Sequence, residues 1–269
     1  RVINHFRTAS KLFGKDLKYC SDSSSESGKK VKEISGDIIF TTDTGKIIND
    51  ESIRAVIVST PAETHFDLTR ELLLAGKNVL VEKPITLNSA EARELNSIAE
   101  ESGLILMVGH LLLYHPAILK IKEFIDSGKL GNLQYIYSNR LNLGTIRTEE
   151  NILWSFAPHD ISVIQYFTGS VPEEVTATGA IFVQKNIQDT TLTYLKFKNN
   201  IHAHIYVSWL HPFKEQRLVV IGAKSMMVFE DTLRENKLKL YKKGFEMVNG
   251  IPVKMDADFE NMEFDSTSL

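Results

Sequence analysis

The sequence predicts an α/β first domain with a parallel sheet, followed by an α+β second domain built on a large, mostly antiparallel sheet. Two observations predict this class. Short apolar strands alternate with helical segments over residues 1–115, which is typical of a parallel sheet with helices on both faces. From residue 116 onward strand-like stretches dominate, and several of them alternate polar and apolar residues. That alternation leaves one face of the second sheet open to water or to a partner.

The elements of the first domain, residues 1–115, follow from apolar spacing and turn signals. Apolar residues at helical spacing from Val2 to Leu12 predict a first helix, which Gly14 would end. The near-continuous apolar run at residues 55–58 predicts a central strand that is covered on both sides. The predicted strands span residues 17–20, 37–40, 54–59, 78–82 and 104–108. The predicted helices between them span residues 28–34, 45–49, 63–75 and 89–102.

The second domain, residues 116–269, begins with a predicted helix at residues 117–127 and a turn at Gly128 to Gly131. One further helix is predicted from about His159 to Phe167, ended by Thr168 and Gly169. The predicted strands span residues 133–139, 175–182, 190–197, 201–209, 217–221 and 226–230.

Composition excludes several classes of protein. The formal net charge of −3 comes from interleaved acidic and basic residues, so a nucleic-acid partner is not expected. No apolar run approaches the roughly 20 residues that cross a bilayer, so we expect no membrane segment. The single cysteine, Cys20, excludes an internal disulfide framework and a cysteine-based zinc cluster. The cytoplasm is therefore the expected compartment.

The first domain has the frame of a Rossmann-like dinucleotide-binding domain. In such folds an acidic residue after the second strand binds the adenosine ribose. Asp22 stands at that position, although an aspartate after a strand is more often a turn-former. No Gly-rich phosphate-binding turn precedes the first helix, so we expect the first strand and this turn to be missing from the chain. Because Asp22 would repel a 2′-phosphate, NAD is predicted in preference to NADP.

A charged pair and a proline end the buried strand at residues 78–82. Glu82, Lys83 and Pro84 follow directly on its apolar residues. A Glu-Lys pair at a strand end usually faces solvent, but ligands of open parallel sheets gather at the carboxyl ends of strands. Pro84 cannot donate to a sheet ladder, so it ends the strand and fixes how Lys83 leaves it.

These residues resemble the signature of the family of glucose-fructose oxidoreductase, inositol dehydrogenase and the rhizopine-catabolism proteins. The segment Ser59-Thr60-Pro61, with His65, is similar to that family's nucleotide-contacting loop, and residues 108–116 to its crossover between domains. The resemblance implies that these loop residues, Glu82, Lys83 and His110 lie along a nicotinamide cofactor. It also implies that the chain lacks the closing helix and strand, so the second domain is expected to be truncated too.

The segment from Trp154 to Ser162 resembles the family's second signature and supplies the predicted catalytic pair. By this resemblance His159 begins the helix of the substrate domain and acts with Lys83 on the proton of a hydroxyl group, while the cofactor takes the hydride. Ser155 stands where inositol-type members have an aspartate. Asp160 is expected to be a first-turn acid of that helix. Predicted substrate contacts are Lys83, Tyr114, Trp154, Ser155 and His159.

The resemblance favours a sugar substrate, specifically a nucleotide-linked sugar such as a UDP-N-acetylhexuronate. A free cyclitol or aldose is the enzymatic alternative, and a non-catalytic NAD- or sugar-binding protein of the same fold is the alternative from another class. His202 and His204 share one face of a strand, but no third metal ligand is evident, so no metal is predicted. The open sheet face of the second domain is expected to form a homo-oligomer, as it commonly does in this family.

Overall fold

The computed structural model describes residues 2–144, 146–148, 150–242, 245–254 and 258–264. Two compact units make up the chain, Arg1–Gly109 and His110–Leu269. The predicted boundary after residue 115 lies within the second unit, because the 3-10 helix Leu111–Tyr114 packs against two helices of that unit. No helix in the described ranges is both long and apolar enough to cross a membrane.

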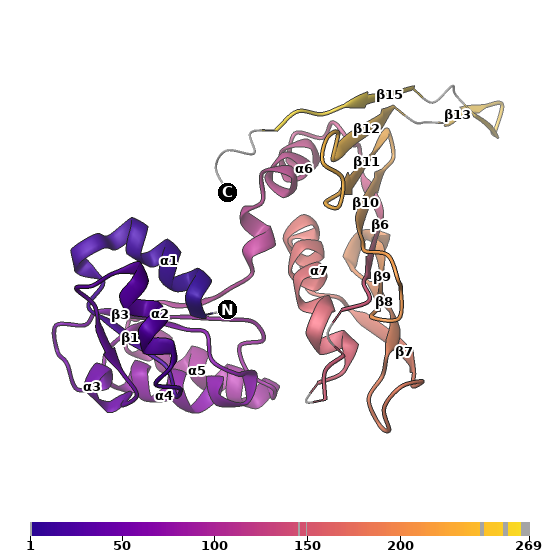
Figure 1. The fold of residues 1–269 in the computed structure, drawn as a ribbon. Helices are drawn as coiled ribbons and strands as arrows, with labels where there is room; N and C mark the ends of the chain where they lie inside the picture. Colours follow the sequence, from indigo (N-terminus) through magenta and orange to yellow (C-terminus); the bar gives the residue numbers. More distant parts are fainter. Residues whose placement is uncertain (1, 145, 149, 243–244, 255–257, 265–269) are drawn as a thin grey trace. The chain divides into compact units, whose positions relative to one another are not determined.

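The first unit contains every strand and helix predicted for it, with shorter strands (Figure 1). Its helices are α1 (Val2–Phe13), α2 (Ser27–Ile34), α3 (Gly45–Ile48), α4 (His65–Leu74) and α5 (Ser89–Glu101), with short 3-10 turns at Gly14–Asp16 and Ala62–Thr64. Its strands are β1 (Tyr19–Ser21), β2 (Ile39–Thr41), β3 (Ala55–Val58), β4 (Asn78–Val81) and β5 (Leu106–Val108).

The strands of this unit pair in parallel, as predicted, but form two sheets. β1 pairs with β2, and β4 lies between β3 and β5. Within the described residues β1 and β3 do not pair with each other. The prediction that residues 55–58 form a covered central strand is therefore wrong, because β3 is an edge strand and Ile57 is 37% exposed. An apolar run shows that a strand is partly buried, but it does not show how many neighbours the strand has.

Each sheet of the first unit has its own buried cluster. Phe6, Cys20, Val31 and Ile38 pack together between α1, α2 and the β1–β2 pair. The second cluster joins α4 and α5 to the three-stranded sheet. It contains Val58, Leu72, Leu73, Val79, Val81, Leu95 and Ala99. Apolar side chains on one stripe of each helix thus hold the strand ends in place, and the functional residues follow those ends.

The second unit is built on an eight-stranded sheet with the order β15-β12-β11-β10-β6-β9-β8-β7. Every pairing is antiparallel except β6 with β9, so the prediction of a mostly antiparallel sheet is confirmed. The strands are β6 (Leu133–Leu141), β7 (Glu174–Ala180), β8 (Thr190–Lys196), β9 (His202–Ser208), β10 (Glu215–Gly222), β11 (Ser225–Glu230), β12 (Leu238–Lys242) and β15 (Asp258–Asn261). β12, β15 and the hairpin of β13 (Phe245–Val248) and β14 (Ile251–Lys254) were not predicted.

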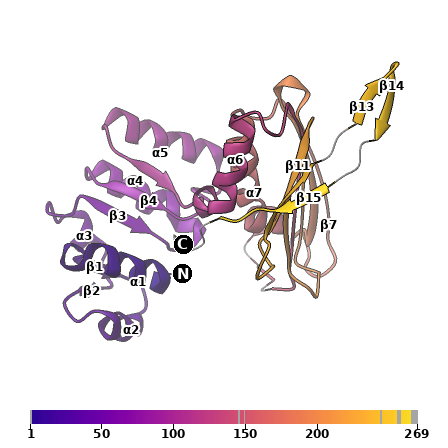
Figure 2. The same ribbon diagram turned by 90° about the horizontal axis from the view of Figure 1, so that it is seen from above.

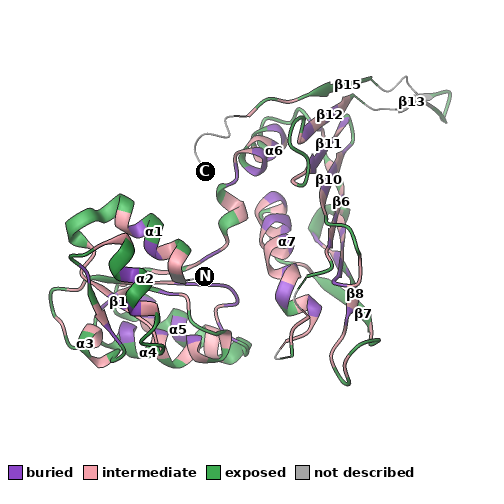
Figure 3. Ribbon diagram, in the orientation of Figure 1, coloured by how far each residue is buried: buried purple, intermediate pink, exposed green. Residues whose placement is uncertain are grey.

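Two helices, α6 (Pro116–Asp126) and α7 (Ile152–Thr168), lie on one face of this sheet (Figures 1 and 2). Their buried residues form one cluster with the strands beneath them, including Ile121, Ile164, Ile136 and Ile205. Figure 3 shows buried residues along α7 and along the strands that it covers. Among the residues of this unit that the structure describes, no helix lies on the opposite sheet face.

Helix α7 differs from its prediction at its start. It begins at Ile152 rather than near His159, because the side-chain oxygen of Asn151 caps it by accepting from the backbone N–H of Trp154 at 3.2 Å. Pro158, directly before the predicted start, lies inside the helix. The predicted end is confirmed, since Gly169 has φ 62° and accommodates the left-handed C-terminal cap.

Candidate active site

Three residues that follow parallel strands lie side by side in the first unit. Ser59 follows β3, Glu82 follows β4 and Gly109 follows β5. The backbone N–H of Glu82 donates to Val58 at 2.9 Å, and that of Gly109 donates to Val81 at 2.8 Å, so strand pairing extends to this edge. The structure therefore gathers the predicted Ser-Thr-Pro and Glu-Lys-Pro segments at the carboxyl ends of one sheet, which is where open α/β sheets bind ligands.

The Glu82 carboxylate is held in one orientation by its neighbours. One oxygen lies 2.6 Å from Nε2 of His5 on α1, and the other accepts from the backbone N–H of Lys83 at 3.2 Å. A Cβ at Gly109 would come within 3.3 Å of this carboxylate, so glycine leaves room for it. His5 was not predicted as a site residue, and its separation of 77 residues from Glu82 leaves no local signal to find it.

Lys83 is 7% exposed and directly precedes Pro84, to which it is joined by a cis peptide bond. The structure therefore supports the placing of Lys83 at the edge of the sheet that the Glu-Lys-Pro motif predicted.

His65 begins α4 and joins the two predicted loops. Its Nδ1 lies 2.7 Å from the carbonyl oxygen of Pro84, and its Nε2 lies 2.9 Å from that of Thr60. The residue is 1% exposed. The predicted direct contact between His65 and a cofactor stays a prediction, whereas its contacts with the Thr60 and Pro84 backbones are a finding.

Asp22 follows β1, as predicted, and takes part in a turn. One carboxylate oxygen accepts from the backbone N–H of Ser24 at 2.8 Å. Among the described residues no hydrogen bond is made to its second oxygen. The turn-forming role and the predicted ribose-binding role are therefore compatible, since a carboxylate has about four acceptor positions.

The predicted substrate residues of the second unit lie mainly on α7. Ser155 is 7% exposed, and His159 stands one helical turn further along on the same side of the helix. Trp154 is 42% exposed. Tyr114 is 60% exposed at the end of the 3-10 helix that packs against α7, and His110 is the first residue of this unit.

Asp160 is not a first-turn acid, and that expectation is wrong. It lies in the middle of α7, where its carboxylate accepts from Ser138 at 2.6 Å and from Nε and Nη2 of Arg140 at 2.8 and 3.1 Å. Burial alone would lower the pKa of Arg140, but the charge and hydrogen bonds of Asp160 raise it above its ordinary value. This buried ion pair ties the helix that carries His159 to β6. Ser138 and Arg140 point to the same sheet face, but their partner in α7 could not be foreseen from that spacing.

His202 and His204 lie on the open sheet face, as predicted. Nδ1 of His202 lies 2.6 Å from the Tyr194 hydroxyl, and Nδ1 of His204 lies 2.7 Å from that of Tyr135. The ring of His204 also stacks on Tyr137, with 5.2 Å between centroids. Within the described part of the chain no three potential ligands come together to hold a metal ion.

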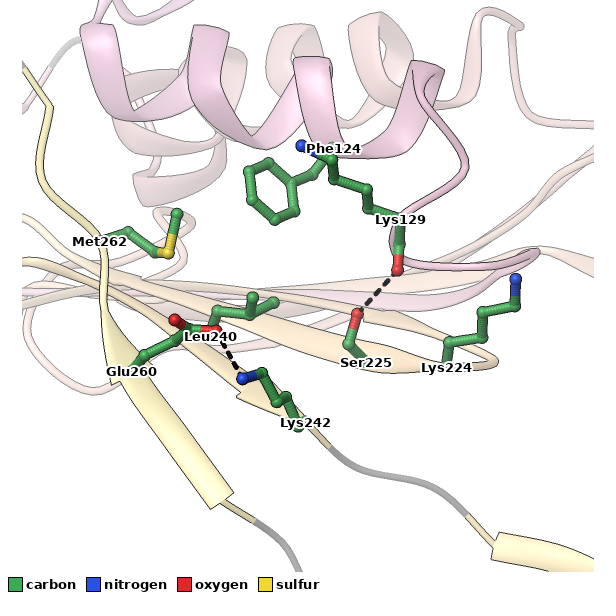
Figure 4. A pocket seen from close by; sticks show the side chains of 8 residues that line it. All are labelled: Phe124, Lys129, Lys224, Ser225, Leu240, Lys242, Glu260 and Met262. Carbon is green, nitrogen blue, oxygen red and sulfur yellow. Dashed lines mark hydrogen bonds and ion pairs between the residues drawn. The ribbon is translucent and has the colours of Figure 1, made fainter.

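A hollow of about 420 Å³ in the second unit lies apart from all of these residues (Figure 4). The Phe124 ring and the Met262 side chain line it, with Lys129, Lys224 and Lys242 at its rim. Lys242 is paired with Glu260 at 3.0 Å. None of the predicted site residues lines this hollow, so it is not the candidate active site.

Two family models match the chain, one for each unit. Residues 2–110 match the model described as an oxidoreductase family with an NAD-binding Rossmann fold. Residues 118–228 match the C-terminal domain of GFO/IDH/MocA proteins.

Curated relatives carry names of sugar and cyclitol dehydrogenases. The chain is 27% identical to the scyllo-inositol 2-dehydrogenase (NAD(+)) of Bacillus subtilis over 212 residues, which cover 75% of this chain and 62% of the relative. It is 29% identical to the UDP-N-acetylglucosamine 3-dehydrogenase of Acidithiobacillus ferrooxidans over 207 residues, covering 74% and 62%. The chain thus spans about 62% of the length of these relatives.

A solved structure of the Acidithiobacillus ferrooxidans enzyme has the same fold. The TM-score is 0.82 at 23% identity, with 98% of this chain and 80% of the other covered. At this level of identity the likeness concerns the fold alone.

Proposed function

The chain belongs to the GFO/IDH/MocA oxidoreductase family, and on that premise we propose that it is part of an NAD-dependent oxidoreductase acting on a hydroxyl group of a sugar or cyclitol. The single observation that carries this proposal is the placing of Glu82 and Lys83. Both follow β4 at the carboxyl edge of the parallel sheet, beside Ser59. A buried lysine at this edge is suited to exchange the proton of an alcohol.

The residues that follow β1, β3 and β4 fit an adenine dinucleotide. Asp22 has acceptor capacity for ribose hydroxyls, and the segment Ser59-Thr60-Pro61 lies at the same sheet edge as Glu82. The space kept open by Gly109 lets the Glu82 carboxylate stand at this edge. When bound, NAD supplies the acceptor for the hydride. Asp22 also favours NAD over NADP, because a carboxylate repels a 2′-phosphate.

Lys83 and His159 are proposed to handle the substrate proton. Lys83 takes the hydroxyl proton during oxidation and returns it during reduction. His159, on α7 with Ser155 one turn away, orients the hydroxyl or shares its proton. By the sequence resemblance, inositol-type relatives carry an aspartate at the position of Ser155. The side chain one turn before His159 is therefore a hydroxyl in this chain and a carboxylate in those relatives.

The proposed substrate class is a nucleotide-linked sugar, such as a UDP-N-acetylhexuronate. The name of the Acidithiobacillus ferrooxidans relative supports it, and the name of the Bacillus subtilis relative supports a free cyclitol equally. The exposed Trp154 and Tyr114 are proposed to contact the sugar, because aromatic faces pack well against apolar faces of ring substrates.

Turnover with a substrate panel tests these roles. The absorbance of NADH is followed with UDP-N-acetylglucosamine, UDP-N-acetylglucuronate, scyllo-inositol and myo-inositol, each with NAD. We expect Lys83→Ala to lose turnover while NAD still binds, and Lys46→Ala, on an exposed part of α3, to keep both. Binding of NAD without turnover of any compound would favour a non-catalytic binding protein, and equal affinity for NADP would remove the role of Asp22.

A homo-oligomer formed through the open sheet face is proposed as well. This face carries Leu192 and Tyr194, which are 45% and 40% exposed, next to the His204–Tyr137 stack. Apolar and aromatic residues of this kind are typical of subunit interfaces. Sedimentation equilibrium should show an oligomer that Leu192→Glu dissociates, whereas a monomeric wild-type chain would contradict the proposal.

A further inference from the structure

One buried histidine ring makes both of its polar contacts to the loops of the candidate cofactor site. Nδ1 of His65 lies 2.7 Å from the Pro84 carbonyl oxygen, and Nε2 lies 2.9 Å from the Thr60 carbonyl oxygen. Thr60 belongs to the segment after β3, and Pro84 directly follows Lys83 after β4. The ring is therefore a direct link between the segment proposed to contact the dinucleotide and the segment that carries the proposed proton carrier.

Both of these partners are acceptors, and this decides what the ring must supply. A carbonyl oxygen cannot donate, whereas a neutral imidazole has one N–H donor and one nitrogen lone pair. A neutral His65 would donate to one carbonyl and set its lone pair against the other oxygen. With the residue 1% exposed, water does not relieve that repulsion. Two hydrogen bonds form only when both nitrogens carry a proton, and charge-assisted bonds are the stronger kind.

The charged groups near His65 do not account for a second proton on its ring, so the two carbonyl oxygens must stabilise that proton. On its own segment Glu63 and Asp67 are exposed, and on the β4 side the charged neighbours are Glu82 and Lys83. The Glu82 carboxylate is already engaged by His5 and by a backbone N–H. Among the described residues no ion pair joins His65 to a carboxylate, and its place at the start of α4 disfavours a cation through the helix dipole. The carbonyl oxygens of Thr60 and Pro84 must outweigh that effect.

We propose that His65 is a positioning residue that donates from both ring nitrogens and thereby fixes the Thr60 and Pro84 loops relative to each other. The tie to Pro84 sets how Lys83 leaves β4. The tie to Thr60 sets the backbone of the Ser-Thr-Pro segment. The assignment of the two loops to cofactor and proton rests on the proposed function, whereas the two-donor ring does not.

Two amide substitutions separate the two ties. The amide nitrogen of asparagine takes about the place of Nδ1, so His65→Asn keeps the Pro84 tie and loses the Thr60 tie. The amide nitrogen of glutamine reaches the place of Nε2, so His65→Gln keeps the Thr60 tie and loses the Pro84 tie. We expect His65→Asn to raise the Kd for NAD on the order of tenfold, or about 1.4 kcal/mol. We expect His65→Gln to lower kcat with little change in Kd.

The matched control is Arg70→Gln on the same helix. Its exposed side chain pairs with Glu94 at 2.7 Å, away from both loops, so this variant should change neither quantity. Calorimetry gives Kd, and the NADH assay gives kcat. A residue that only stabilises the fold would lower thermal stability in both His65 variants without this split. Equal losses of binding and turnover in the two variants would therefore overturn the positioning role.

Nitrogen NMR of the histidine-labelled wild-type chain tests the two-donor ring without any reaction. We expect both nitrogens of His65 to carry protons in the folded chain, with the signals assigned by their loss in His65→Gln. A single neutral tautomer would overturn this part of the proposal. If the wild-type chain turns over no compound, the proposed activity fails, but the NMR result and the NAD affinities of the two variants still decide the role of His65.

Discussion

Replacing Asp160 by asparagine should strongly destabilise the second unit. The Asp160 carboxylate, only 5% exposed, accepts from Ser138 and from two nitrogens of Arg140 at 2.6 to 3.1 Å. An amide removes the negative charge and directs an N–H group toward donors. The Arg140 guanidinium, 14% exposed, is then left charged and without its ionic partner. Removing one member of a buried ion pair costs about 3–5 kcal/mol.

The structure favours the lower end of that range. Because Arg140 keeps some exposure to water, we expect a loss of about 3 kcal/mol in the free energy of unfolding of this unit. With a urea m-value of about 2 kcal/mol/M, this loss lowers the unfolding midpoint by roughly 1.5 M. Both tryptophans of the chain, Trp154 and Trp209, lie in the second unit, so their fluorescence reports its unfolding.

Two matched variants make the test sharp. Asp126→Asn makes the same chemical change in an exposed pair with Lys122 on α6 and should cost less than about 0.5 kcal/mol. The double variant Arg140→Met with Asp160→Leu removes both charges and should recover much of the loss. A midpoint for Asp160→Asn no lower than that of Asp126→Asn would refute the reasoning. A double variant as unstable as the sum of its single changes would also contradict it.

Three further predictions concern pH and the cofactor. Burial alone would raise the pKa of Asp189, but its hydrogen-bond donors, which include the Trp209 indole, outweigh burial and lower the pKa. The ionised carboxylate therefore stabilises the fold, and this stabilisation is lost as pH falls below about 4. In urea unfolding, Asp189→Asn should abolish this pH dependence and cost about 2 kcal/mol at pH 7. Burial lowers the pKa of His115, so the unfolded chain binds the proton at a higher pH than the folded chain does. The free energy of unfolding should therefore fall as pH drops below about 6.5. His115→Asn, whose side chain can still cap α6, should reduce this dependence of stability on pH. Gly109→Ala places a Cβ 3.3 Å from the Glu82 carboxylate and should weaken NAD binding on the order of tenfold by calorimetry, and unchanged affinity would contradict the role of this space.

The first unit could be predicted closely because its signals are local. Each apolar stretch and each turn residue acts on its own few neighbours, so the strands and helices up to β5 emerged with small errors at their ends. The Glu-Lys-Pro segment could also be placed at the sheet edge, because carboxyl ends of parallel strands share one edge. The pairing of the strands was less predictable, because an apolar run such as residues 55–58 does not reveal whether one or two strands will pair with it.

The second unit shows where local signals mislead. The family resemblance suggested that a helix starts at His159, whereas the helix begins at Ile152 after the cap at Asn151. Strands β12 and β15 were both missed. β12 alternates apolar and polar residues, with Leu238 and Leu240 buried, so it could have been predicted. β15 has a single apolar residue, Phe259, and owes its form to pairing with β12.

By itself the sequence determined the fold class and the family resemblance and indicated the candidate site residues, because these depend on periodicity and on short motifs. Only the tertiary structure decided which side chains support them. His5 on Glu82, His65 between two carbonyls and Arg140 on Asp160 are contacts between residues 77, 19 and 20 positions apart. The physical reason is that a buried polar group must find a partner wherever packing brings one, and packing is a property of the whole unit rather than of a segment.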